Sequence, residues 1–192
     1  MYKAKWLCAA VVLLAACKSQ ESPKQAQARM EKESEAFTAA VSAISKRYQA
    51  WFAAGQADSI ANIFTEQGRQ MPPNEPAVIG RPAIKVYEGR HAAVMVPKLS
   101  LRGESYMASG PLGVERGATR STERPSPAHR RGMPATVHDE GKYLIHWHHV
   151  NGQWQIADMI WNSSRSMSAA RRRAKKKPAT TTKPASTSKK KK

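Results

Sequence analysis

Apolar residues recur every three or four positions between Phe37 and Phe52, with polar residues between them. This spacing puts the apolar side chains on one face of a helix and predicts a long amphipathic helix at the start of the folded region. The positions on that face are Phe37, Val41, Ile44, Tyr48, Trp51 and Phe52. Gly55 is the expected stop.

Two further helices are expected in the first half of the chain. Asp58 is suited to cap a short helix with Ile60, Ile63 and Phe64 turned inward, ending near Gly68. Residues 71–76 contain three prolines and predict a rigid loop. Gly80-Arg81-Pro82 then opens a third helix, with Ile84 and Tyr87 on its buried side and His91 and Val94 as further candidates for that side.

The second half of the chain changes to the two-residue period of strands. We expect strands over residues 98–107, 113–121, 142–150 and 153–162, with a long loop over 122–134. The last two strands are joined by Asn151-Gly152, a strong hairpin signal. Helices followed by an antiparallel sheet indicate the α+β class. About four long strands would curl around the first helix and leave a cavity at one open end.

The start of the chain predicts export. Lys3 and Lys5 precede an apolar run over residues 6–14, about half of the ~20 residues that a membrane span needs. The tetrapeptide Leu14-Ala15-Ala16-Cys17 resembles the bacterial lipobox, and this resemblance implies lipidation of Cys17. We therefore expect a signal peptide over 1–17, a tether over 18–34, one folded domain over 35–164 and a membrane-anchored lipoprotein. Lys18 is not the aspartate linked to inner-membrane retention, so the outer membrane, facing the periplasm, is preferred.

Cleavage before Cys17 would leave the mature chain with no other cysteine, because Cys8 lies in the signal peptide. This excludes a disulfide, a thiolate zinc cluster and a cysteine nucleophile. Gly-rich phosphate loops, nucleophile elbows and zinc-protease helices do not occur in the sequence either. We expect no cofactor.

Residues 165–192 contain twelve Lys or Arg and no acid, which predicts a disordered basic tail. The tail carries most of the net charge of +18, since residues 18–164 hold eighteen basic and fourteen acidic residues. Adhesion to anionic lipid or another polyanion is the favoured interpretation, and a merely solubilising tail is the alternative. Nucleic acid is disfavoured because export separates it from the protein and no aromatic residue in the tail offers base stacking.

Several short pieces, in order, resemble the SnoaL-like domains of the nuclear transport factor 2-like and ketosteroid isomerase-like superfamily. The resemblance covers about residues 40–164. Its pieces are Tyr48, Ala54-Gly55, Asp58, Ile63-Phe64-Thr65, Met71-Pro72-Pro73-Asn74, Gly80-Arg81, Ile84, 141–147, 152–154 and 160–163. It implies a single cone-shaped domain in which a curved antiparallel sheet wraps around the N-terminal helices. It also implies a pocket but no particular reaction.

Ketosteroid isomerases use a tyrosine on the first helix, an aspartate base after the second helix and an acid on a late strand. Tyr48 matches the tyrosine, the place of the aspartate falls within Met71-Pro72-Pro73, and the place of the acid falls near His146. Glu75 is nearby, but it could replace the aspartate only if the loop took a changed path. The base is therefore missing from its place, which argues against steroid-type isomerisation.

The predicted pocket combines helix, loop and late-strand residues, with His146 as the polar group and Tyr48 either as a pocket donor or as a core tyrosine. The expected lining is Tyr48, Met71, Asn74, Tyr87, His146, Met159 and Trp161. On the last strand, Met159 and Trp161 are expected on the cavity face with Ala157, and Asp158 on the outer face with Ile156. His146 and His148 share a strand face, but no third ligand is evident at a helpful spacing, so no metal site is expected.

Three hypotheses follow. The leading one is a tethered domain that binds a small, largely apolar molecule and forms a homodimer through the outer face of its sheet. The second is an isomerase, lyase or hydrolase that uses His146 and Tyr48 as catalytic residues. The third is a non-catalytic dimerisation or spacer module.

Overall fold

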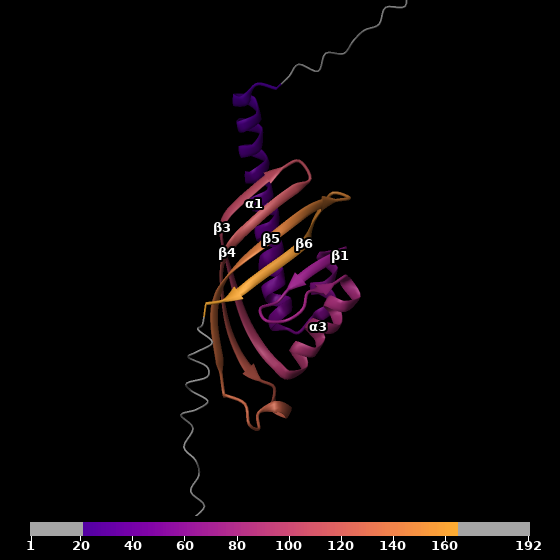
Figure 1. Cartoon of the computed structure of the whole chain (residues 1–192), viewed down its shortest axis with the longest axis vertical. Helices are drawn as coiled ribbons and strands as arrows, with labels where there is room; N and C mark the ends of the chain where they lie inside the picture. Colours follow the sequence, from indigo (N-terminus) through magenta and orange to yellow (C-terminus); the bar gives the residue numbers. More distant parts are fainter. Residues whose placement is uncertain (1–20, 165–192) are drawn as a thin grey trace, which may run out of the picture.

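The computed structural model describes residues 21–164, in which a long helix crosses the concave face of a strongly bent sheet (Figure 1). The helices are α1 (Pro23–Ala53), α2 (Ala57–Asn62) and α3 (Arg81–Val94), and a 3-10 turn covers Pro127–His129. The strands are β1 (Phe64–Met71), β2 (Val78–Ile79), β3 (Met95–Ser109), β4 (Leu112–Pro125), β5 (Val137–Val150) and β6 (Gln153–Ser163). They form one six-stranded sheet in the order β2-β1-β6-β5-β4-β3, antiparallel except where β1 runs parallel to β6. The predicted α+β cone is confirmed.

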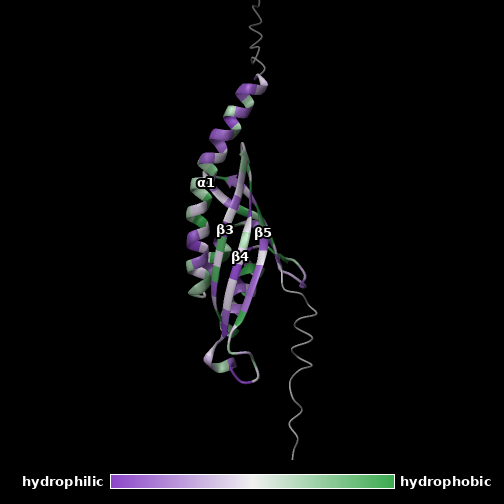
Figure 2. Cartoon of the chain, turned by 90° about the vertical axis from the view of Figure 1, so that its left-hand side faces the viewer, coloured by the Kyte–Doolittle hydropathy of each residue, from purple (hydrophilic) through white to green (hydrophobic). Residues whose placement is uncertain are grey.

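Helix α1 is longer than the sequence pattern predicts. Ser22 caps it through a capping box with Gln25, and Pro23 occupies an early position. The residues predicted as a tether are thus helical from Pro23 onward. Figure 2 shows that these first turns are mostly hydrophilic and stand beyond the sheet, whereas the later turns carry apolar residues against it. The buried face agrees with the predicted face at Phe37, Val41, Ile44 and Tyr48.

The predicted second helix is wrong beyond Asn62. Helix α2 ends there, and residues 64–71 form strand β1 instead of a further helical turn. Strand β1 lies beside β6, where the Ile156 N–H donates to the Ile63 carbonyl at 2.8 Å. Phe64 is fully buried as expected, but from a strand. This tertiary pairing satisfies the backbone and overrides the weak local helical pattern.

The long strands confirm the predicted strand segments and extend them. Strand β4 continues to Pro125, so the predicted loop over 122–134 is shorter than expected. The hairpin between β5 and β6 turns at Asn151 and Gly152, both with positive φ (50° and 78°), as expected for Asn-Gly.

The core fills the narrow end of the cone. Phe37 projects from α1 between strand residues, and its ring centroid lies 6.4 Å from that of Trp147 and 4.7 Å from that of Trp154. Gly113 on β4 makes room for the Phe37 ring, because a Cβ at that position would lie 2.6 Å from a ring carbon. At the other end of α1 the helix and the sheet diverge, and a cavity remains.

Candidate ligand pocket

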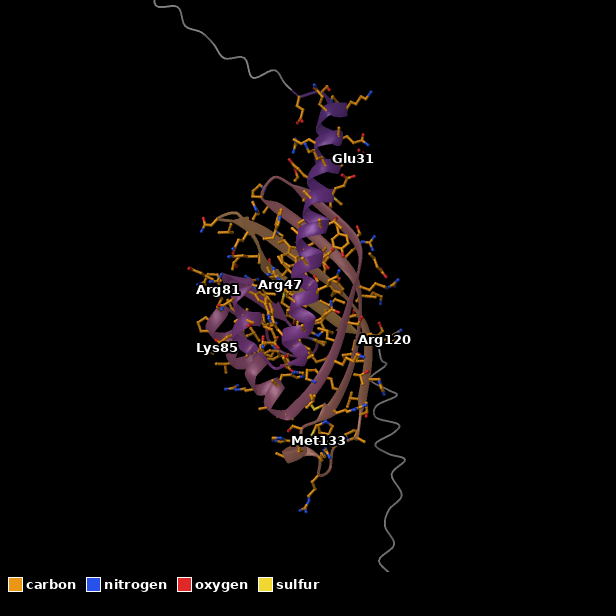
Figure 3. The ribbon with its side chains drawn as sticks, turned by 180° about the vertical axis from the view of Figure 1, so that it is seen from behind. Glu31, Arg47, Arg81, Lys85, Arg120 and Met133 are labelled. Atoms are coloured by element: carbon orange, nitrogen blue, oxygen red, sulfur yellow. The ribbon has the colours of Figure 1, made fainter. Side chains whose placement is uncertain are left out.

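A cavity of about 440 Å³ lies between the end of α1, helix α3 and the concave face of the sheet. It is at the end of the cone away from the projecting turns of α1. Figure 3 shows the two ends of the molecule, with Glu31 of the projecting turns at one end and Met133, in the loop between β4 and β5, at the other. The lining is Tyr48, Phe52, Pro72, Pro73, Glu75, Tyr87, Glu88, His91, Leu99, Leu101, Thr119, Ser121, Glu123, Val137, Asp139, Glu140, Tyr143, Met159, Trp161 and Ser163.

The structure brings together four of the seven residues predicted for the pocket, namely Tyr48, Tyr87, Met159 and Trp161. Met71 and Asn74 are not part of the lining, although Pro72, Pro73 and Glu75 of the same loop are. Met71 pairs with Ile160 at the β1–β6 junction, and Asn74 is exposed with a φ of 63°. Asn74 thus occupies the left-handed turn conformation that asparagine tolerates, and it faces solvent.

His146 lies on the outer face of the sheet and does not line the cavity. Its neighbours Ile145 and Trp147 are buried on the concave side, and side chains alternate along a strand. The His146 Nδ1 atom lies 3.1 Å from Asp158 Oδ2, and Asp158 Oδ1 lies 3.7 Å from Arg69 Nε. The interpretation of His146 as the polar or catalytic group of the pocket is therefore corrected.

A bulge at Ala157 changes the phase of β6. His146 pairs with Asp158 and Trp147 pairs with Ile156, so Ala157 has no partner on β5. Ile156 is consequently buried together with Met159, whereas strict alternation would put them on opposite faces. Asp158 is on the outer face as predicted, but the assignment of Ile156 to that face is wrong.

The rings of His146 and His148 are neighbours, with centroids 4.6 Å apart. Within residues 21–164 there is no group of three or more His, Cys, Asp or Glu side chains that could hold a metal ion. In the same range, no helix is long and apolar enough to span a bilayer.

Tyr48 is both a core residue and a pocket residue. Its ring stacks on Phe52 at 6.0 Å, and Phe52 stacks on His91 at 5.3 Å, so a row of three rings connects α1 with α3. The side chain is 5% exposed, and its hydroxyl makes no hydrogen bond within residues 21–164. Burial, and then the nearby Glu88, raise the pKa of this hydroxyl well above its usual value. It is a neutral donor facing the cavity.

Glu88 of α3 is a buried carboxyl group of the pocket. It is 4% exposed and accepts a hydrogen bond from Gln70 Nε2 at 2.7 Å. Burial raises the pKa of Glu88, and the Gln70 bond and His91 offset part of this rise. Glu88 was not predicted for the pocket, although the sequence contains a signal for this position. Glu88 follows Ile84 by one helical turn, and His91 follows Glu88 at a similar spacing, so all three share the buried face.

His91 is the histidine that the pocket contains. Its Nε2 lies 3.3 Å from Oε2 of Glu123 on β4. The hydrogen bond to Glu123 raises the pKa of His91, against the lowering effect of burial. Both residues are partly buried and line the cavity, which gives a paired acid and base facing a hollow space.

A second buried carboxyl group, Glu115 of β4, lies on the concave face of the sheet next to the cavity wall. It is fully buried and accepts hydrogen bonds from the Tyr143 hydroxyl at 2.7 Å and from Trp147 Nε1 at 3.2 Å. Burial raises the pKa of Glu115, and the two bonds counteract the rise. The lining residue Tyr143 is held in place by this contact.

Further carboxyl groups lie where the pocket meets the ends of β5 and β6. Asp139 accepts from Ser163 Oγ at 2.7 Å, and Glu140 lies 2.9 Å from Arg120 Nε.

Glu75 on the proline-rich loop is the fifth carboxyl group of the lining, and it lies near Tyr87. Burial, and then the charge of Glu75, raise the pKa of Tyr87 to about 12. The lining therefore contains five carboxyl groups and one histidine, with no lysine or arginine.

No family model matches the sequence, and no curated protein matches it. Solved structures do. A protein of unknown function from Mycobacterium tuberculosis is 23% identical with a TM-score of 0.62, covering 72% of this chain and 78% of that chain. A ketosteroid isomerase-like protein from Erwinia carotovora atroseptica is 18% identical with a TM-score of 0.58, covering 67% and 96%.

An NTF2-like protein with a cystatin-like fold from Novosphingobium aromaticivorans is 14% identical with a TM-score of 0.57, covering 80% of this chain and 97% of that chain. Because these identities are low, the likeness shows the fold and not the reaction. The chain has the fold of the NTF2-like and ketosteroid isomerase-like proteins, as the resemblance in its sequence implies.

Proposed function

We propose that this protein is an exported, lipid-anchored binding protein that holds a small, largely apolar molecule in the conical pocket. One observation carries the proposal. The wide end of the cone is hollow, and its cavity of about 440 Å³ is lined by eleven apolar or aromatic residues and nine polar ones. Ligand pockets of about 300–1,000 Å³ have this make-up. A spacer module has no need of such a cavity.

The pocket walls suit an apolar ligand body. Leu99 and Leu101 of β3 lie on one side, and Met159 and Trp161 of β6 on another. Removing apolar surface from water contributes about 25 cal/mol per Å², so a ligand that fills the hollow gains affinity from these walls alone. The polar groups then select among ligands of similar size.

The membrane attachment is proposed from Cys17 and from the basic tail, both outside residues 21–164. The described helix is consistent with a tether, because α1 starts at Pro23, shortly after Cys17, and runs unbroken to the pocket. Replacing Cys17 with Ala should abolish acyl labelling and release the protein from the membrane fraction. Continued acylation of Cys17→Ala would contradict the lipoprotein assignment.

The tail is proposed to bind anionic envelope surfaces. Each Lys or Arg near an anionic surface contributes about 1 kcal/mol, and this attraction weakens with salt. Retention of the full chain on vesicles containing anionic lipid should therefore fall as salt rises and should drop sharply when residues 165–192 are deleted. Neutral vesicles are the control. Unchanged retention on anionic vesicles after the deletion would contradict the proposed role of the tail.

Ligand retention is the direct test of the pocket. Native mass spectrometry of the full chain purified from its host should show a bound small molecule. Met159→Trp, which fills the cavity, should remove it. The control is Val86→Trp, since Val86 is 50% exposed on α3 and outside the pocket. A wild-type chain that carries no ligand and gains no thermal stability from a library of apolar compounds would overturn the proposal.

The second candidate is an enzyme that moves a proton, and the His91–Glu123 pair favours it. This pair replaces His146 and Tyr48 as the expected acid–base group, because His146 points away from the cavity. His91 would take or give the proton while Glu123 orients its ring. Deuterium exchange from D2O into a panel of simple ketones should then depend on His91 and be lost in His91→Gln. Equal exchange with both proteins would exclude this activity.

A further inference from the structure

We propose that the ligand of this pocket is an organic cation, an ammonium or amidinium group carried on an apolar body. The inference rests on the proposed binding function and specifies its ligand class. Three features of the cavity carry it: the sign of the charges in its lining, the aromatic rings that share this lining, and the Tyr48 hydroxyl, which opens onto the cavity without a hydrogen-bond partner in residues 21–164.

The lining charges are of one sign. Glu75, Glu88, Glu123, Asp139 and Glu140 line the cavity, and His91 is the residue there that can become positive. The nearby Arg120 does not line the cavity, is 73% exposed and contacts Glu140 from outside. An anionic ligand would meet repulsion from several carboxylates at short range, whereas a cation would be attracted by each. Fatty acids, bile acid-like molecules and phosphate esters are therefore disfavoured.

Some of these carboxyl groups have no cation of their own. Glu123 faces His91 and Glu140 faces Arg120, but Glu88 accepts from the neutral amide of Gln70 and Asp139 from the hydroxyl of Ser163. Neither Glu88 nor Asp139 forms an ion pair with another residue in the range 21–164. Asp139 is only partly buried, but Glu88 is 4% exposed, and burying its carboxyl group in this way is unfavourable unless a counter-charge arrives. A ligand cation would provide that counter-charge.

Aromatic rings line the same space. Tyr48, Phe52, Tyr87, Tyr143 and Trp161 all contribute to the wall. The faces of such rings carry partial negative charge and attract alkylammonium groups, by about 2 kcal/mol when water is excluded. A neutral apolar ligand could bind equally well to aliphatic walls. A lining that combines aromatic rings with carboxyl groups therefore favours a cation.

The Tyr48 hydroxyl is an independent sign of a polar ligand. The side chain is 5% exposed and lines the cavity, yet its hydroxyl makes no hydrogen bond within residues 21–164. The hydroxyl therefore opens onto the cavity, where a ligand with a polar group near its charged end could form a hydrogen bond with it.

The test compares three probes of similar shape. These are (3-hydroxyphenyl)trimethylammonium, its neutral isostere 3-tert-butylphenol, and the anion 3-hydroxybenzoate. Binding to the full chain is measured by calorimetry. We expect the cation to bind about tenfold or more tightly than the neutral phenol, as one cation–aromatic or carboxylate contact provides, and the anion not to bind.

Substitutions then locate the effect. Glu88→Gln and Asp139→Asn should each reduce the cation's affinity severalfold and leave the affinity of the neutral phenol unchanged. Glu66→Gln makes the same change in charge at an exposed position outside the pocket and should affect neither probe. Thermal unfolding establishes that each variant is folded. Two carboxyl groups are tested so that the failure of one variant to fold does not decide the result.

The outcomes separate this inference from the proposed function. Equal or tighter binding of the neutral phenol, or no binding of the cation at millimolar concentration, overturns the organic-cation proposal. The binding function would still stand if native mass spectrometry shows a neutral ligand that Met159→Trp removes. If no ligand of any charge is retained, both proposals fail together.

Discussion

Burying a carboxyl group without a cation beside it costs free energy, and this domain does so at two positions, Glu88 and Glu115. The two positions differ in what they face. Glu115 is enclosed by the Tyr143 hydroxyl and the Trp147 indole, so its hydrogen bonds are made within the protein. Glu88 borders the cavity, with one amide donor. Glu115 thus stabilises the fold through its internal hydrogen bonds, whereas Glu88 faces the space that a ligand would occupy.

The raised pKa of Glu88 predicts how its replacement changes stability with pH. A folded-state pKa above the unfolded value means that the folded state holds the proton more tightly. The stabilisation is complete below the unfolded pKa, about 4.3, and is lost as pH rises through the folded pKa. Glutamine cannot ionise, so the Tm of Glu88→Gln minus that of wild type should rise between pH 4 and pH 8. Glu66→Gln, at an exposed site, should follow wild type. Parallel curves for Glu88→Gln and wild type would refute the burial argument.

Gly113 predicts a steric effect in the narrow end. A Cβ there would lie 2.6 Å from a carbon of the Phe37 ring, which is itself held against Trp147 and Trp154. Gly113→Ala should therefore destabilise the domain by about 1–3 kcal/mol. In a Phe37→Leu background the same substitution should cost less, as a double-mutant cycle in urea would show.

The matched control for this substitution is Gly89→Ala in α3. The nearest atom to an added Cβ there is 3.9 Å away, at Ala57, so the change should be neutral or stabilising by up to about 1 kcal/mol. Additive effects of Gly113→Ala and Phe37→Leu would show that the ring does not set the size of residue 113.

At the scale of elements, the patterns that repeat along the chain predicted best. The apolar stripe of α1, the Gly-Arg-Pro opening of α3 and the Asn-Gly hairpin all depend on local chemistry, and all three are present. Strand β1 has no such pattern, because polar residues dominate Phe64–Met71 and its position depends on β6. Contacts between segments far apart in the sequence decide such a strand.

The residues of the pocket could be predicted only where one local sequence pattern determines which way a side chain points. The helix stripe identifies Tyr48, and strand alternation identifies Met159 and Trp161 on one face. No sequence pattern marks the bulge at Ala157. Once the pairing of β5 with β6 is known, the alternation of side chains places His146 on the outer face. Glu88 and Glu123 were not predicted because charged residues are usually exposed. Their positions follow from the packing of α3 across the open end of the sheet, a contact between segments far apart in the sequence.

The attachment of α1 to the β3–β4 hairpin provides a prediction for this helix. Ser34 Oγ accepts a hydrogen bond from the Ala108 N–H at 3.0 Å, and Glu33 Oε2 accepts from the Gly110 N–H at 2.9 Å. Ala108 is 3% exposed, so Ser34→Ala leaves its N–H buried and unpaired. We expect a loss of about 1–3 kcal/mol in stability and faster hydrogen exchange at the Ala108 amide.

Ser42→Ala makes the same truncation about two helical turns further along α1 and is the control. It should change the stability by only a few tenths of a kcal/mol. If Ser34→Ala exchanges at Ala108 as slowly as wild type, the hairpin is held by other contacts and the start of α1 is free to separate from it.

The whole molecule has two distinct ends. Helix α1, ~46 Å long at 1.5 Å per residue, carries the projecting turns at its start and Tyr48 and Phe52 of the pocket near its finish. The described chain ends at the pocket, where the Ser164 N–H donates to the Glu140 carbonyl at 2.7 Å. The start of α1 at Pro23 therefore lies at the opposite end of the helix from the cavity.

The outer face of the sheet remains to be explained, because it carries apolar side chains that nothing in residues 21–164 covers. Leu144 on β5 is paired with Ile160 on β6, and they are 42% and 46% exposed. Leu112 and Val114 on β4 extend the same surface, at 50% and 39% exposed. These apolar side chains lie among the polar residues Arg116, His146 and Asp158 on the same face. Such a mixed surface suits a second copy of itself, since an isologous contact buries the same residues twice. We therefore expect the homodimer that the sequence predicted to form through this face.

The dimer prediction is tested by placing a charge in the centre of the face. Ile160→Asp should weaken dimerisation at least about thirtyfold, because a charge would be buried without a partner twice per dimer. Sedimentation of the mature chain over a concentration series measures the change. Val86→Asp, which adds the same charge at a 50% exposed position on α3, should leave the dimer intact. A wild-type chain that stays monomeric at high concentration, or equal weakening by Val86→Asp, would remove the outer face as an interface. Ligand binding by Ile160→Asp should persist, since Ile160 does not line the cavity.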